Sequence, residues 1–135
     1  MTHFRTLLLC IGLMGGSCAT VIESVADPVA LQATTSPSPS LVELIVEGEL
    51  WPKNGVLKPN RLPSGSWTEL GSIPQGAVFQ SNDGILQLDT GHRYECCLVV
   101  DRANVVGFYL PVEEVFVPVR EPSFVEIRPS PQNNN

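Results

Sequence analysis

The sequence predicts an all-β domain over residues 41–128, and three observations carry that prediction. From position 41 onward, apolar and polar residues alternate with a period of two, which is typical of strands with one buried face. Clusters of Pro, Gly, Asn and Asp separate the apolar segments and predict turns between antiparallel neighbours. No part of this region has the 3.6-residue period of a helix. We therefore expect a small antiparallel meander that closes into a barrel or a two-layer sandwich, because closure removes exposed strand edges.

The first expected strand covers residues 41–50. One of its faces is apolar and carries Val42, Leu44, Val46 and Leu50. The opposite face carries three glutamates, together with Leu41 and Ile45. This pattern predicts a strand that is buried on one side only.

Two turns are expected around the short strand 77–80. Pro74 and Gly76 predict a type II turn before it. The Ser-Asn-Asp-Gly run at 81–84 predicts a hairpin after it, because Asn, Asp and Gly tolerate positive φ. Residues 85–88 should then return antiparallel to the strand 77–80.

The second half of the domain contains the strongest strand pattern. We expect strands at 94–100, 105–110, 115–119 and 124–127, with turns at 90–91 and 101–104. In the first of these, Tyr94, Cys96, Leu98 and Val100 share one face. The apolar segment 107–113 is interpreted as a core strand that leaves the sheet at Pro111, with a partner-binding edge as the alternative.

The N-terminal residues have the order of a secretory signal peptide. Arg5 precedes a nine-residue apolar run at 6–14, and the small residues at 15–17 lead to Cys18. The apolar run is too short to span a bilayer, which needs about 20 residues.

Over about the first 20 residues, the chain resembles the precursors of bacterial lipoproteins. The resemblance implies that Cys18 receives a diacylglyceryl group, that signal peptidase II removes residues 1–17, and that the new N-terminus is acylated. Gly15 departs from the family, which favours Leu three positions before the cysteine. Ala19 follows the cysteine where an Asp would signal retention in the inner membrane. The implied address is the outer membrane, facing the periplasm, or the cell membrane in a host without an outer membrane.

The segments that flank the domain are expected to be disordered. Residues 18–40 should form a flexible tether behind the lipidated cysteine, since 34–40 contains only Thr, Ser and Pro. A weak helix over 21–31 is the alternative. Residues 129–135 should form a frayed tail.

Composition and motif searches argue against several classes of function. Fourteen acidic and eight basic residues give a net charge of −6, which disfavours nucleic-acid binding. After signal removal His92 is the only histidine, and one histidine cannot build a metal site. Glu113 and Glu114 would face opposite sides of a strand, so they make a poor acid–base pair. We expect no catalytic residues, no metal and no cofactor, and therefore no enzyme.

Cys96 and Cys97 are neighbours in the chain. Their Cα atoms lie about 3.8 Å apart, which is below the usual disulfide range. The favoured interpretation places Cys96 in the core and Cys97 on the opposite face. An intermolecular disulfide and a vicinal redox pair are the alternatives.

The loop 52–66 is the candidate partner-binding segment. Lys53, Lys58 and Arg61 give it a charge of +3, whereas the rest of the chain after signal removal carries −10. Trp51 and Trp67 flank the loop, and aromatic and basic residues are common at binding surfaces. The alternative is a surface loop whose two tryptophans pack onto the core.

Together these features predict a membrane-anchored envelope lipoprotein. It would act as a structural or protein-interaction component of a secretion, conjugation or pilus type of assembly. The alternative is a periplasmic inhibitor or ligand-binding module. The expected partners are the membrane, through the lipid anchor, and an envelope protein.

Overall fold

The computed structural model describes residues 26–35, 41–53, 61–89 and 92–130. Within these residues there are ten strands and no helix, which confirms the all-β prediction. The strands are β1 (Asp27–Pro28), β2 (Gln32–Ala33), β3 (Leu41–Val46), β4 (Ser66–Ile73), β5 (Gly76–Ser81), β6 (Gln87–Asp89), β7 (Arg93–Glu95), β8 (Cys97–Asp101), β9 (Asn104–Leu110) and β10 (Val115–Pro129). None of the described segments forms a helix long and apolar enough to cross a membrane.

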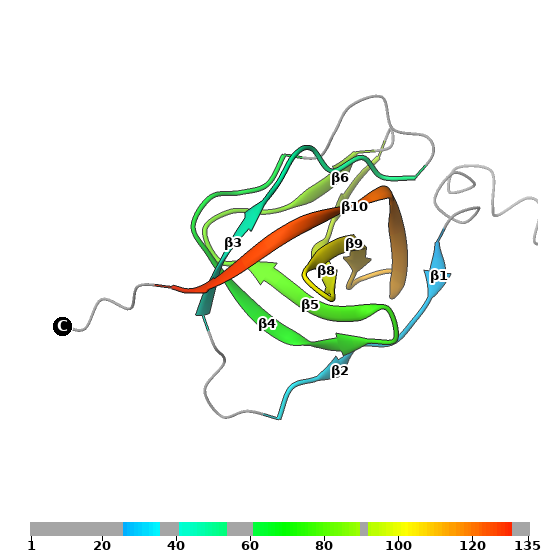
Figure 1. Ribbon diagram of the computed structural model, residues 1–135. Helices are drawn as coiled ribbons and strands as arrows, with labels where there is room; N and C mark the ends of the chain where they lie inside the picture. Colours follow the sequence, from blue (N-terminus) through cyan, green and yellow to red (C-terminus); the bar gives the residue numbers. More distant parts are fainter. Residues whose placement is uncertain (1–25, 36–40, 54–60, 90–91, 131–135) are drawn as a thin grey trace, which may run out of the picture.

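Six of these strands form a closed antiparallel ring. The order is β3–β4–β5–β8–β9–β10, and β10 pairs with β3 to close it (Figure 1). Of the two expected architectures, the barrel is therefore the one observed. The short strands β6 and β7 form a separate hairpin.

Closure depends on the length of β10, which runs for 15 residues where two short strands were expected. Its first part pairs with β9, with Val115 opposite Leu110. Its last part pairs with β3, with Val125 opposite Val46. The pairing with β9 is irregular between Pro118 and Ser123. Prolines donate no backbone hydrogen bond, so the strand can bend there while its partners change.

The expected hairpin at 81–84 is wrong. β5 pairs with β8, whereas residues 87–89 pair with β7. A two-residue type I′ hairpin needs positive φ at both central residues, and neither Asn82 nor Asp83 has it. Their polar groups instead bind β4: the N–H of Asn82 donates to the carbonyl of Ser66 at 2.9 Å, and the N–H of Ser66 donates to the carboxylate of Asp83 at 2.7 Å.

The turn between β4 and β5 is present but is not of type II. Ile73 pairs with Gly76 across the two turn residues. A type II turn needs positive φ at Gln75, and Gln75 does not have it.

The inside of the barrel is filled by a large apolar cluster. It joins the inward-facing side chains of all six ring strands, which come from residues that alternate along each strand. Its bulkiest member is Trp67, which is 1% exposed. The expected inward face of the first strand is confirmed, because Val42, Leu44 and Val46 pack against this cluster and Leu50 is part of it.

A second apolar cluster lies on the opposite face of the wall. It contains Ile73, Val78, Cys97, Val99, Tyr109 and Phe116. Residues 26–35, which we call the strap, cover this cluster with the half-buried side chains of Val29 and Leu31. The backbone of Leu31 also forms a hydrogen bond with the phenol of Tyr109.

The strap corrects the expected tether, because residues 26–35 belong to the folded domain. β1 pairs with β10, and β2 pairs with β4 through Gln32 opposite Ser72 and Ala33 opposite Gly71 (Figure 1). Gly71 permits this close approach, since a Cβ atom there would collide with the backbone of Gln32. The strap is thus an additional strand segment that bridges β10 and β4. Pro129, expected in the tail, is the last residue of β10.

Candidate functional site

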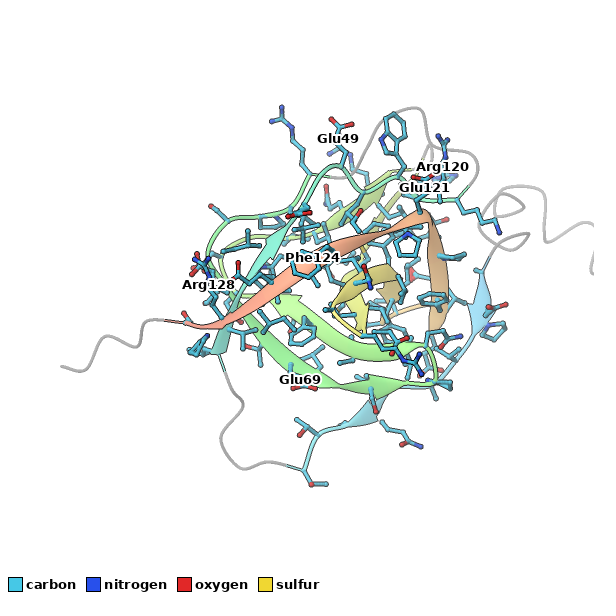
Figure 2. The ribbon with its side chains drawn as sticks, in the orientation of Figure 1. Glu49, Glu69, Arg120, Glu121, Phe124 and Arg128 are labelled. Atoms are coloured by element: carbon cyan, nitrogen blue, oxygen red, sulfur yellow. The ribbon has the colours of Figure 1, made fainter. Side chains whose placement is uncertain are left out.

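Two surfaces of the barrel have features of a contact site, and the first is centred on Trp51. Its indole N–H donates to the carboxylate of Glu49 at 3.3 Å. The guanidinium of Arg120 lies over the ring, 5.0 Å from its centre. The backbone N–H of Arg120 also donates to the backbone carbonyl of Trp51 at 2.7 Å. We call Trp51, Lys53 and Arg120 the tryptophan platform; Glu49, Arg120 and Glu121 gather at that end of the molecule (Figure 2).

The structure divides the residues that the sequence proposed for partner binding. Trp51 is half-buried, and Lys53 and Arg61 are exposed. Lys58 lies outside the described residues. Trp67 is 1% exposed and packs inside the barrel, so it offers no surface to a partner.

Arg120 was missed by the sequence reasoning. It lies 69 positions after Trp51 in the chain, and only the pairing of β10 with the segment 50–53 brings the two together. A lone arginine in a strand gives no sequence signal for such a contact. The cation over an aromatic ring holds Trp51 in place at the surface.

The second surface is the outer face of β3 and the last part of β10. Leu41, Ile45 and Phe124 point outward there and are 38%, 37% and 49% exposed. Ile45 lies opposite Glu126, and the N–H of Glu47 donates to the carbonyl of Phe124 at 2.9 Å. Ile45 and Phe124 are therefore diagonal neighbours on one face. We call these three apolar residues and the charged residues between them the β3–β10 face; Figure 2 labels Phe124 and Arg128, which lie on it.

The charged residues of the β3–β10 face are mainly acidic. Glu43, Glu47 and Glu126 are exposed, and Arg128 is the single base among them. Arg128 lies opposite Glu43 and forms a two-pronged ion pair with Glu126 at 3.0 Å. The hydrogen bond from Arg128 to Glu126 and the charge of that carboxylate raise the pKa of Arg128. An apolar surface with an acidic surround fits a basic, amphipathic partner segment.

The two cysteines of the barrel are free thiols, and both are buried. Cys96 belongs to the cluster inside the barrel and Cys97 to the cluster on the outer side, which confirms the favoured interpretation. Burial raises the pKa of Cys96 well above its ordinary value and raises the pKa of Cys97 to about 11. Thiols that remain neutral are poor nucleophiles and poor metal ligands.

The polar chemistry of the described residues is sparse. No group of three or more His, Cys, Asp or Glu side chains among them could hold a metal ion. His92 packs edge-on against Tyr94, with ring centres 6.5 Å apart. Glu113 and Glu114 lie in the turn before β10, where both are exposed.

The surface of the described part is hollowed in places. One hollow, of about 440 Å³, lies between the strap and the turn from β4 to β5. Its lining contains no ionisable side chain: Pro28, Val29, Ala30, Gln32, Ser72, Ile73 and Pro74. A smaller one, of about 110 Å³, lies beside Cys96, Cys97 and Pro111.

Comparison with known proteins finds no match to this chain among family models, curated proteins or solved structures. The features that bear on function are therefore the tryptophan platform, the β3–β10 face and the N-terminal sequence.

Proposed function

We propose that the chain is an exported lipoprotein, anchored at Cys18 in the outer membrane and facing the periplasm. In this proposal the barrel is a structural or protein-interaction component of a cell-envelope assembly. The order of charged residue, apolar run, small residues and cysteine over positions 5–18 supports the anchor. Acyl chains with about 0.8 kcal/mol per buried methylene would hold it stably.

The strap supports a position of the barrel close to the proposed anchor. The first described residue of the domain is residue 26, eight positions after Cys18. Eight residues of extended chain reach at most about 28 Å, well short of the roughly 70 Å that a 22-residue spacer would give. A partner of the barrel would therefore be met near the membrane surface.

The β3–β10 face is the observation that carries the interaction role. The described residues contain six exposed large hydrophobic side chains, and three of them lie on this face: Leu41, Ile45 and Phe124. Exposed apolar groups that gather on one face, with polar residues around them, mark a protein-interaction site. The tryptophan platform is the second proposed contact, in line with the sequence-based proposal for Trp51, Lys53, Lys58 and Arg61.

The anchor has a direct test in the chain itself. Cys18→Ala should abolish labelling with radioactive palmitate and leave the precursor uncleaved by signal peptidase II. Cys10→Ala is the matched control, because Cys10 lies within the apolar run of the signal. This variant should still be labelled with palmitate and still be cleaved by signal peptidase II. Labelling that persists in Cys18→Ala would refute the anchor.

The basic loop beside the tryptophan platform is tested by charge reversal. Changing Lys53, Lys58 and Arg61 to Glu should lower the yield of a protein crosslinked in native membranes. Thermal stability should be unchanged, because the charges of Lys53 and Arg61 are exposed and such charges contribute little to folding. Arg93→Glu, on the exposed β7, is the control. Unchanged crosslinking in the triple variant would leave the β3–β10 face as the sole contact. A soluble rather than a membrane partner would favour the inhibitor or ligand-binding alternative.

A further inference from the structure

The strap fills a ready-made seat on the barrel. The seat consists of an edge of β4 at Gly71 and Ser72, an edge of β10 at Val115 and Phe116, and the outer apolar cluster between them. Four residue pairs of the ladder and two half-buried side chains, Val29 and Leu31, hold the strap there. Backbone hydrogen bonds from Val29 to Glu114 and from Thr34 to Leu70, and the hydrogen bond between Leu31 and Tyr109, add to them. This is a small interface compared with the continuous pairing inside the ring.

The connection from the strap to the barrel is longer than its path requires. Ala33 lies opposite Gly71, and Leu41 lies opposite Thr68 on the same edge of β4. The pairing positions of Ala33 and Leu41 on β4 are therefore three strand residues apart, about 10 Å. Residues 34–40 join them and include Pro37 and Pro39. An extended Pro-rich chain of that length reaches about 25 Å.

From this geometry we propose that the strap exchanges between two copies of the chain. In the exchanged dimer, each strap lies in the seat of the other copy. There it forms the same residue pairs with β4 and β10 that it forms within its own chain. The strap of a second copy can take the place of the first, because it has the same sequence as the segment that the seat holds. The connection of residues 34–40 spans up to about 25 Å when extended, more than the gap of about 10 Å that it covers within one copy. Exchange of an identical element between copies forms dimers at low energetic cost.

The proposal does not depend on the lipid anchor, although an anchor would raise the local concentration of copies. Linked segments compete with an effective concentration in the millimolar range. Copies held in one membrane can approach that concentration, whereas dilute soluble copies cannot. Exchange should therefore increase with the amount of protein per membrane area.

A disulfide between register partners tests the exchange. Gln32 and Ser72 lie opposite each other and both are exposed. One copy carries Gln32→Cys, a second copy with a different tag carries Ser72→Cys, and both are produced together and oxidised gently. The native Cys96 and Cys97 are buried and should not compete. A disulfide-linked dimer that contains both tags is expected.

The matched control uses the hairpin of β6 and β7. Gln87 lies opposite Glu95, and both are exposed, but a short connection holds these strands together. Gln87→Cys and Glu95→Cys in separate copies should give no linked dimer. Equal dimer yields from the two pairs would mean random collision and would overturn the proposal.

A shortened connection separates exchange from simple unfolding. Deletion of residues 36–39 leaves enough chain to cover the gap of about 10 Å within one copy, but too little to reach a second seat. When Gln32→Cys and Ser72→Cys are combined in one chain with this deletion, the disulfide should form within that chain and the linked dimer should be lost. A linked dimer that survives the deletion, or a full-length double variant that links only within one chain, would overturn strap exchange.

Discussion

The barrel has two apolar areas on its outer side, and the chain treats them differently. The first, around Val78, Val99 and Phe116, is covered by the strap and almost wholly buried. The second, the β3–β10 face, is left open, with Phe124 49% exposed. Among the described residues, the strap covers the first area and no segment covers the second. We propose that a protein partner covers the second area.

The largest loss of stability is expected from a substitution at Gly71, where β4 meets the strap. Gly71→Val should destabilise the domain by about 2–3 kcal/mol, because the new side chain would collide with the backbone of the strap and because Gly71 has a φ of 155°, which a β-branched residue rarely adopts. Chemical denaturation measures the loss. Gly48→Asn is the control, since Gly48 has positive φ with open space around it and Asn tolerates that conformation. An equal loss in both variants would mean that the strap does not press on β4 as described.

A pair of polar substitutions compares the two outer areas directly. Leu31→Ser, in the strap, should lower the free energy of unfolding by about 1–2 kcal/mol, because a half-buried apolar group that packs on the second cluster is removed. Ile45→Ser, on the open face, should cost well under half as much. The midpoints of urea unfolding give both values. If Ile45→Ser were the more costly change, the open face would serve the fold rather than a partner.

The smallest effect concerns the covered area and pH. Burial raises the pKa of Cys97 to about 11 from an ordinary value of 9.0, so the unfolded thiol loses its proton first as pH rises. The unfolded state then binds fewer protons, and stability falls with pH. Stability should be unaffected below pH 9 and should decline as pH rises towards 11. Cys97→Val should make the unfolding midpoint less dependent on pH in that range; an unchanged slope would contradict the assignment.

Local patterns were enough to predict the strands and their faces. The alternation of Tyr94, Cys96, Leu98 and Val100 placed these residues on one face, and all four contribute to the cluster inside the barrel. The break of that segment at Cys96 into β7 and β8 was not expected. Alternation reports which side a residue faces, but not where hydrogen bonding to a neighbour stops.

Long-range pairing was the part that the sequence could not supply. The turn residues Asn82 and Asp83 suggested a hairpin, yet their polar groups bind the start of β4 instead. The sequence of the strap does not predict strands, because its apolar residues are few and lie beside a Pro-rich segment. Its strands are only two residues long, and tertiary contacts with β4 and β10 alone make them strands.

The candidate site changed for the same reason. The basic loop pointed to Trp51 correctly as a surface residue but included Trp67, which the barrel buries. Composition identifies an aromatic residue near bases; it does not identify which side of a strand the ring lies on. The β3–β10 face joins residues about 80 positions apart, and only the register of β3 with β10 makes it visible.

We propose that the β3–β10 face binds a protein of the envelope. A photo-crosslinking amino acid in place of Phe124, in native membranes, should give one discrete crosslinked protein, and the added Ile45→Glu substitution should abolish it. Val112 is the control position, since it is 79% exposed on a turn and so more open to random contact. If the β3–β10 face binds a partner, we expect a discrete product from position 124 and only diffuse or no product from position 112. No product from position 124, or the same product from both positions, would contradict it.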